Sequence, residues 1–388
     1  MMAATLIICS DMLAQEYDTF AIIAEFLGNA SAEDIDPEEV ERLERYIEHP
    51  LKINIAGQSK LEECGLLTQY QTASLMDYLT RHGDILSLTE LAAVDGFGTD
   101  FVRRLSFFIS LESGRLPGYG AMSSKRFHQE LEVKATGRCN DELIGQYALK
   151  YRIGIGESLQ ASFSLSKSSA AGRPDAFPGN IFWYFRRYGA KVAVGNFNAR
   201  FGQGLALWSG MSISGRSKPS SYLKRSSNLS PSYSYTGNYS FKGIAAEAIF
   251  GNFKMTYITT LSGSEGERGL LPAVNLTLLC THGQVGLTHY ADFRLPDGVF
   301  YIPDMKTSFD MAMTLRGVDL FAETAYDWNS DSVASLAGVV FPAGENLRVA
   351  SALRYYPSAF QSTYSAAIRA LTKCTNEYGC STSAEFSS

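Results

Sequence analysis

The segment 306–327, KTSFDMAMTLRGVDLFAETAYD, decides the fold of this chain. On both sides of Arg316-Gly317 the side chains alternate between apolar and polar. The apolar series comprises Phe309, Met311, Met313, Leu315, Val318, Leu320, Ala322 and Tyr326. The other series carries full charges of both signs, on Lys306, Asp310, Asp319, Glu323 and Asp327. Because successive side chains of a β-strand point to opposite faces, this period of two predicts two strands joined by a short turn, each with one apolar face.

Segments with the same alternation follow one another from Phe127 onward. They run to about ten residues, whereas strands of soluble proteins average about 5–6 and strands that cross a bilayer need about 9–11. We expect strands to start near Phe127, Leu143, Ser158, Asn180, Ala190, Phe241, Asn252, Pro272, Gln284, Lys306, Val318, Val333 and Asn346. A charged series suits a water-filled lumen and an apolar series suits lipid, so the region 127–388 is predicted to be an antiparallel transmembrane β-barrel. A soluble β-protein is the alternative.

The predicted strand number, about 13, does not fit a closed bacterial barrel, which has an even number of strands. The last residues, Ala384 to Ser388, are interpreted as a polar tail and not as a strand. An unpaired edge in lipid leaves backbone N–H and C=O groups without partners. We therefore expect either one miscounted strand or a barrel that is incomplete at the C-terminus and continues beyond Ser388.

Composition and charge exclude several classes of protein. Hydrophobic residues make up 45% of the 388 residues and charged residues 19%, which excludes an intrinsically disordered chain. The net charge of −6 argues against a protein that coats nucleic acid. The charge is unevenly distributed: residues 33–113 hold 16 acidic and 7 basic residues, whereas residues 114–388 hold 20 acidic and 27 basic residues. The chain therefore joins an acidic part to a basic part.

The residues before 127 are expected to form a leader, a helical domain and a linker. Residues 1–15 carry a short apolar run followed by small residues, which is typical of a partial signal peptide, although a frayed terminus is the alternative. Residues 16–113 are predicted to be a small all-α domain, and the Gly-rich segment 114–126 a linker. The fold class is thus α+β multidomain, with helices first and the barrel second.

Helix start signals are dense in this domain. Asp36-Pro37 is expected to begin a helix that runs to His49, because Asp caps a helix and Pro suits its first position. Capping boxes are predicted at Ser59 with Glu62, at Thr68 with Gln71 and at Ser87 with Glu90. Several short helices joined by tight turns therefore lie between Ser59 and Leu111.

The turns between these helices resemble those of a tandem helix-hairpin-helix domain of the competence type. The turn-bearing segments are Leu51 to Ala56, Cys64 to Thr68 and Val94 to Thr99. The resemblance implies phosphate or DNA binding by the hairpins and the arginines beside them, at Gly65, Gly96, Phe97, Gly98, Thr99, Arg103 and Arg104. The first hairpin departs from the pattern, because Leu67 stands where the second glycine belongs, and this puts its phosphate site in doubt.

The net charge of −9 on this domain weighs against DNA, because nonspecific DNA binding needs Lys and Arg to displace counterions. The alternatives are that the acidic domain docks other envelope proteins or packs below the barrel.

The whole chain from about residue 16 to Ser388 resembles the helix-hairpin-helix outer-membrane proteins of Gram-negative bacteria. Supporting segments are Val194 to Leu205 and Ala352 to Pro357. The resemblance implies an outer-membrane location with the helical domain in the periplasm, and outer-membrane lipid as a partner. A role in transport or envelope assembly is expected; the alternatives are DNA binding or uptake, and a structural anchor that transports nothing.

The segment 198–235 is the longest stretch without strand alternation. It is rich in Gly and Ser and contains Arg200, Arg216, Lys218, Lys224 and Arg225, with no acidic residue. A loop of this length is usually functional or disordered. It is expected either to line the lumen as a plug or constriction that contacts an anion, or to be a solvated surface loop.

Residue patterns for catalysis or metal binding are not found in the sequence. The five histidines have no metal-ligand spacing, and no nucleophile elbow or nucleotide-binding fingerprint occurs. Glu323 and Asp327 are interpreted as polar wall residues and not as catalysts. We expect neither enzyme activity nor a cofactor; Cys374 and Cys380 are expected either to pair or to stay free.

Overall fold

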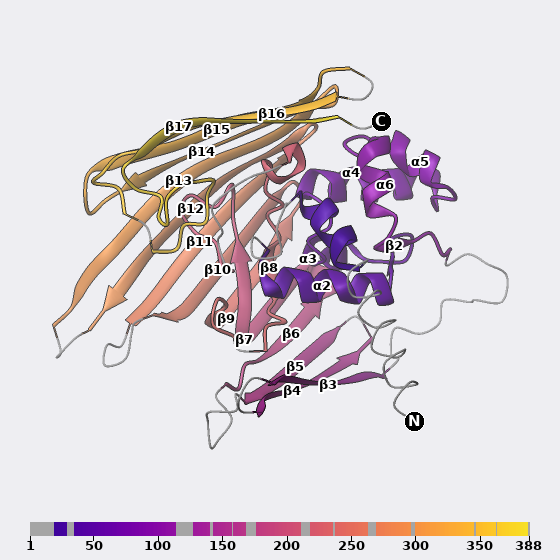
Figure 1. Ribbon diagram of the computed structural model, residues 1–388, viewed down its shortest axis with the longest axis horizontal. Helices are drawn as coiled ribbons and strands as arrows, with labels where there is room; N and C mark the ends of the chain where they lie inside the picture. Colours follow the sequence, from indigo (N-terminus) through magenta and orange to yellow (C-terminus); the bar gives the residue numbers. More distant parts are fainter. Residues whose placement is uncertain are drawn as a thin grey trace.

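The computed structural model describes residues 19–28, 35–113, 127–139, 143–156, 158–167, 176–210, 218–235, 237–262, 269–295, 299–344, 347–361 and 363–386. The predicted signal peptide and linker lie outside these residues. In the described residues, a group of short helices is followed by a large antiparallel sheet (Figure 1). None of the described helices has both the length and the apolar character that crossing a membrane requires.

The helical domain comprises the helical residues 19–27 and five short helices. These are α2 (Pro37–Glu48), α3 (Gln58–Glu63), α4 (Gln69–His82), α5 (Leu88–Ala93) and α6 (Thr99–Leu105). Two short strands, β1 (Leu51–Lys52) and β2 (Ile109–Ser110), pair in parallel and close the domain. Side chains from all these helices share one apolar core, which includes Phe26, Leu43, Leu61, Leu75, Leu91 and Leu105.

The predicted helix starts are largely observed. The Asp36 carboxylate accepts a hydrogen bond from the Glu38 N–H, and Thr68 and Gln71 form a reciprocal capping box at the start of α4. The capping box predicted at Ser59 is wrong. Helix α3 begins one residue earlier, at Gln58, and follows Gly57, which provides no side-chain cap. Glu62 instead accepts a hydrogen bond from the Gln58 side chain.

The sheet contains 15 strands in the described part of the chain. They are β3 (Phe127–Cys139), β4 (Leu143–Ile155), β5 (Leu159–Lys167), β6 (Gly179–Phe185), β7 (Ala190–Arg200), β8 (Asn228–Pro231), β9 (Phe241–Phe250), β10 (Phe253–Ser262), β11 (Gly269–Cys280), β12 (Gly283–Arg294), β13 (Tyr301–Leu315), β14 (Val318–Asp327), β15 (Ser332–Pro342), β16 (Leu347–Tyr356) and β17 (Glu377–Phe386). Each pairs with its neighbour in sequence, except that β9 pairs with β7 and the short β8 pairs separately with the end of β7. Every predicted strand is present.

The turn between β13 and β14 lies where the sequence predicted a turn, and its backbone explains why the chain reverses there. Leu315 faces Val318 across the two strands, so Arg316 and Gly317 form the two-residue turn. Both have positive φ, 52° and 81°, which is the backbone of a type I′ turn and matches the twist of the strands. The cost of positive φ falls on Arg316 alone, because glycine adopts it freely.

Two strands were not predicted, and the interpretation of the C-terminal residues as a polar tail is wrong. Strand β17 pairs with β16 along its whole length. Its alternation is weak because the outward positions after Tyr378 hold Cys380, Thr382 and Ala384 before Phe386, and the inward positions are mostly Gly and Ser. Strand β8 is too short to show any period.

The two faces of the sheet differ in the way that the alternation predicts. Apolar side chains lie exposed on the outer face, for example Leu131 at 63%, Ile244 at 59% and Leu353 at 62% of their full exposure. No second layer of described polypeptide covers them. The inner face is buried and carries most of the charged side chains, among them Lys150, Lys191, Lys254, Lys306, Asp310 and Glu323, which are all almost inaccessible. Apolar side chains such as Phe182, Ile258 and Phe321 are buried on the same face.

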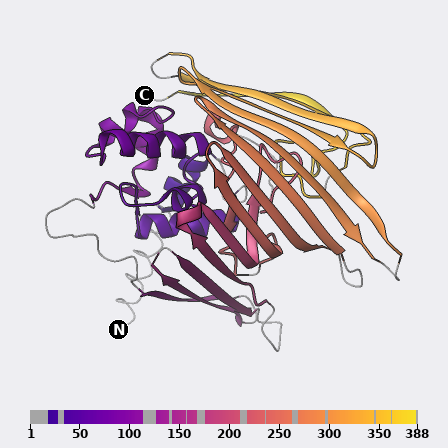
Figure 2. The same ribbon diagram turned by 180° about the vertical axis from the view of Figure 1, so that it is seen from behind.

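The burial of the inner face follows from the position of the helical domain. The sheet curves, and the helices lie on its concave side (Figure 1), as the view from behind also shows (Figure 2). The inward charges were expected to face a watery lumen, but many of them face the helical domain. The sheet is not closed in the described residues, since β3 and β17 are its two edges and do not pair with each other.

Candidate functional site

Helix α2 presents carboxylates to the inner face of the sheet. The Glu41 carboxylate lies 2.5 Å from the Lys150 Nζ on β4. The Glu39 carboxylate lies 2.9 Å from the Arg200 Nη1 at the end of β7. Next to it, the Asn198 side chain donates a hydrogen bond of 2.7 Å to Glu38. Three carboxylates at the start of one helix therefore bind polar groups of two strands.

Helix α3 makes a second set of ion pairs, with strands further along the sheet. The Glu62 carboxylate lies 2.7 Å from the Lys254 Nζ on β10, and both side chains are at most 4% exposed. Glu63 lies 3.0 Å from the Lys191 Nζ on β7 and accepts a hydrogen bond of 2.7 Å from the Tyr184 hydroxyl. Water is nearly absent from these pairs, so they are screened much less than surface pairs.

We call these contacts of α2 and α3 with strands β4, β6, β7 and β10 the docking interface. They explain the uneven charge of the sequence: the acidic part of the chain covers basic groups of the other part. Several carboxylates of α2 and α3 are thus bound by the chain's own sheet. Docking of other envelope proteins by the acidic domain stays a prediction.

The carboxylates of the docking interface differ in how burial and charge set their pKa. Burial raises the pKa of Glu39, but Arg200 and Arg42 outweigh it and bring this pKa below the ordinary value. The same balance, with Lys254 as the main cation, lowers the pKa of Glu62. For Asp36 burial prevails over Arg200 and raises the pKa to about 6. Ion pairing therefore holds the charge on Glu39 and Glu62 most firmly.

The described residues of the segment 198–235, which are 198–210 and 218–235, lie inside the curve of the sheet and not on the outer surface (Figure 1). The N–H groups of Gln203, Leu205 and Ala206 donate to the Glu323 carboxylate of β14, at 2.7, 2.9 and 3.1 Å. Such a ring of backbone donors is a nest for an anion, here the protein's own. Residues 226–232 of the same segment are also buried. Of the two expectations for this segment, the structure favours the plug over the surface loop.

The five basic residues predicted for this segment do not form one cluster. Arg200 belongs to the docking interface, and Lys218 lies 3.4 Å from Glu385 on β17. Lys224 donates to the Ala366 carbonyl, and Arg225 lies against the Phe26 ring. Arg216 lies outside the described residues.

A second inner segment, 357–376, was missed by the sequence analysis. It connects β16 to β17 and joins the first: the Ala366 N–H donates to the Gly204 carbonyl at 2.7 Å, and the Trp208 N–H to the Tyr364 carbonyl at 2.9 Å. Phe360, Ala367 and Ile368 are buried. The apolar run Ala366-Ala367-Ile368 is the local sign of burial in this segment, but it does not identify the distant residues that cover it.

The structure brings only some of the predicted phosphate-binding residues together: Gly96, Phe97 and Arg104 line one pocket. A Cβ at Gly65 would lie 2.6 Å from the Arg42 Nη2, so glycine there allows close packing inside the domain. In the second hairpin the N–H groups of Phe97 and Gly98 donate to the carbonyls of Val94 and Ala92. Neither N–H remains available for a phosphate.

The remaining predicted residues lie on one helix. Thr99 begins α6, Arg103 is exposed on that helix, and Arg104 is buried. DNA binding by the hairpin stays a prediction.

The other chemistry-bearing residues have structural partners. The Asp327 carboxylate lies 3.2 Å from the Lys306 Nζ. Cys374 is buried and Cys380 is exposed, and both are free thiols, so the expected pairing between them is not observed. Within the described residues, His, Cys, Asp and Glu side chains do not gather in groups of three or more that could hold a metal.

Comparison with known proteins gives weak likenesses. No protein-family model matches the chain, and no curated protein matches it. Among solved structures, a mutant of the Rhodopseudomonas blastica porin is 12% identical, covering 59% of this chain and 91% of its own, with a TM-score of 0.23. OmpT, an outer membrane protein of Vibrio cholerae, is 12% identical over 67% of this chain and 97% of its own, with a TM-score of 0.29. Likenesses of this size define neither a family nor a function.

Proposed function

We propose that this chain forms the wall of an outer-membrane β-barrel whose own acidic helical domain occupies the bore and controls passage through it. The observation that carries the proposal is the docking interface. A domain held by buried ion pairs to the inner face of a wall occupies the space through which a solute would pass.

The outer face supports a position in lipid. Apolar side chains stand exposed along strands that are mostly about ten residues long, the length that a bilayer requires. Water would meet a very large continuous apolar surface, which soluble monomers rarely have. The edges at β3 and β17 need partner strands in lipid, because unpaired backbone groups are costly there.

The docking interface supports a domain that can be displaced. A buried ion pair contributes little more net stability than a hydrophobic contact of the same size would. Its two charges, however, must meet in one alignment of the two surfaces. A domain that docks through ion pairs between carboxylates and amines can leave the sheet and bind it again more readily than a domain that packs through a sealed apolar core. Passage controlled by movement of this domain is therefore the role that the geometry supports best.

The test is conductance of the purified full chain in planar lipid bilayers. One variant carries Glu41→Gln, Glu62→Gln and Glu63→Gln, which removes three charges from the docking interface. The matched control carries Asp77→Asn, Asp100→Asn and Glu112→Gln, which removes three charges from exposed positions of the same domain. We expect low conductance from the natural chain and the control, and frequent opening of the interface variant.

Two results would speak against the proposal. Steady high conductance of the natural chain would mean that the helical domain does not close the bore. A chain that stays monomeric and soluble without detergent would contradict the membrane location. If all three proteins insert but none conducts, a structural anchor becomes the better account.

A further inference from the structure

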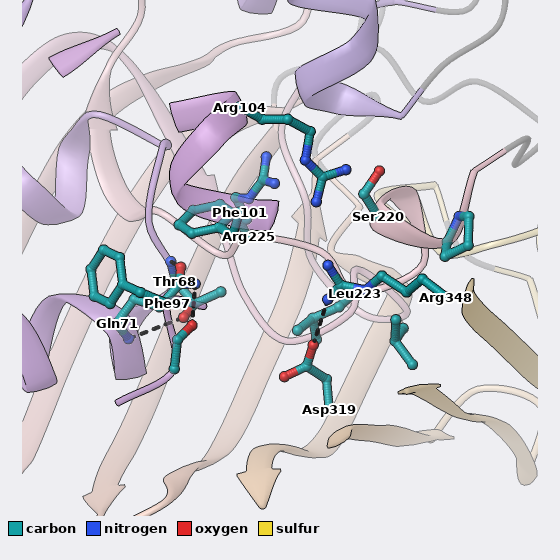
Figure 3. Close-up of a pocket in the computed structure, with 13 residues that line it drawn as sticks. Thr68, Gln71, Phe97, Phe101, Arg104, Ser220, Leu223, Arg225, Asp319 and Arg348 are labelled. Carbon is teal, nitrogen blue, oxygen red and sulfur yellow. Dashed lines mark hydrogen bonds and ion pairs between the residues drawn. The ribbon is translucent and has the colours of Figure 1, made fainter. Parts of the chain in front are cut away.

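A pocket lies where the helical domain, the inner segment 198–235 and the sheet meet, apart from the docking interface (Figure 3). Phe97 and Phe101 line it from the helical domain, Ser220 and Arg225 from the inner segment, and Arg348 from β16. The cavity has a volume of about 60 Å³. This is room for a few waters, at roughly 10–15 Å³ each, and hence for a group of the size of phosphate.

Three guanidinium groups from three parts of the fold converge on this pocket. Arg104 comes from α6, Arg225 from the inner segment and Arg348 from the wall (Figure 3). Asp319 is the one carboxylate among the residues that line the pocket, and it lies 3.3 Å from the Arg348 Nη2. The charges of the lining side chains therefore sum to a positive value.

Two of these arginines, the buried Arg104 and the half-buried Arg225, have no ion pair within the described residues. Arg104 is only 7% exposed, and it has neither a hydrogen bond nor an ion pair from its side chain within the described residues. Arg225 rests on aromatic faces instead of a carboxylate, with its Cζ 4.3 Å from the Phe26 ring centroid and 5.6 Å from that of Phe101. An unpaired buried charge is among the most costly features of a folded protein.

Two further observations agree with a site for an anion. The Ser220 hydroxyl is buried and has no hydrogen-bond partner in the part of the chain that the structure describes. Burial, followed by the positive charge of Arg104, lowers the pKa of Arg225 to about 10. The like charges repel one another when the pocket is empty, and an anion between them would remove that repulsion.

We propose that this pocket binds a phosphate group, held by Arg104, Arg225 and Arg348, which links the helical domain to the sheet. Guanidinium forks match the oxygens of phosphate in geometry and charge. This site goes beyond the proposed control of passage and does not depend on it.

The test is isothermal titration calorimetry of the full chain in detergent, with inorganic phosphate as the probe in a chloride buffer. Arg225→Gln is expected to weaken phosphate binding at least about tenfold, since a hydrogen bond to a charged group contributes about 1.5–3 kcal/mol. Arg81→Gln, at an exposed position of α4 away from the pocket, is the matched control and should bind like the natural chain. Arg225→Lys keeps the charge and should bind between these two.

A second arm distinguishes free phosphate from phosphate on a lipid. Mixed micelles with phosphatidic acid are compared with micelles of phosphatidylcholine alone, in the same buffer. Binding of phosphatidic acid that Arg225→Gln removes supports the site with a lipid as its source. Binding that is equal in Arg225→Gln and the natural chain, or no binding of either probe by the natural chain, overturns the proposal. Circular dichroism of each variant shows that it is folded.

Discussion

At the scale of single residues, one buried lysine, Lys191, forms ion pairs with two carboxylates. The Lys191 Nζ lies 3.0 Å from Glu63 of the helical domain and 3.1 Å from Glu247 of β9, and its side chain is 2% exposed. It also donates to the Leu229 carbonyl of the inner segment at 2.7 Å. One ammonium group thus connects the helical domain, the sheet and the inner segment.

Lys191→Met should therefore destabilise the chain strongly. The substitution leaves two buried carboxylates side by side without a cation, and breaking a buried pair costs about 3–5 kcal/mol. Urea denaturation in detergent measures this loss. Lys373→Met, at an exposed position, should change the free energy of unfolding by less than about 0.5 kcal/mol. Equal stability of the two variants would refute the role given to Lys191.

Acid should act on the docking interface in two opposite ways. The pKa of Asp36 is raised from 3.8 to about 6, so its charged form opposes docking, and stability should rise as the pH falls from 7 through 6. The pKa values of Glu39 and Glu62 are lowered, so their contribution is present above about 4.5 and is lost below it.

The melting temperature measured against pH should therefore pass through a maximum between these limits. Asp36→Asn should reduce the rise on the neutral side and keep the loss on the acid side; part of the rise remains because burial also raises the pKa values of Glu41 and Glu63. A melting temperature that falls steadily from pH 7 in both proteins would show that Asp36 does not oppose docking.

At the scale of elements, the strands were predictable and the inner segments were not. A strand such as β13 shows its two faces in its own sequence, because neighbouring positions meet different surroundings. Strand β17 was not predicted, because small and hydroxyl side chains occupy most of its outward positions. The inner segments depend on contacts far along the chain, such as Leu205 with Glu323, and a local pattern does not contain that information.

The same limit applies to the candidate site. Charge counting predicted an acidic domain beside a basic region, but it did not predict that Glu62 and Lys254 would meet. The hairpin resemblance named Arg104 together with Gly96 and Gly98, but it did not predict that Arg104 and Gly96 line a pocket formed with distant elements.

The outer face of one strand offers a test of the lipid contact. Leu287 lies near the middle of β12, opposite Leu276 of β11, and is 43% exposed. Leu287→Arg should destabilise the chain by about 2–4 kcal/mol in lipid vesicles, because a charge would enter hydrocarbon. Leu86→Arg, at a more exposed position of the helical domain, is the control and should have little effect. If Leu287→Arg is equally harmless, the outer face does not contact lipid.

At the scale of the whole molecule, the chain is a curved sheet folded around its own acidic domain. The sheet alone would expose buried lysines and arginines on its inner face, and the domain alone would expose a row of carboxylates. Each part satisfies the charges of the other. The two inner segments fill the remaining space and connect both parts.

Exchange of charges between Glu62 and Lys254 tests this account most directly. Glu62→Lys and Lys254→Glu each place like charges together and should free the helical domain, which protease digestion of membrane vesicles would then remove. The double variant restores an opposite pair and should recover protection to nearly the natural level. If the double variant is as sensitive as the single ones, or if the natural chain loses its helical domain to protease at once, then the domain is not held against the inner face of the sheet.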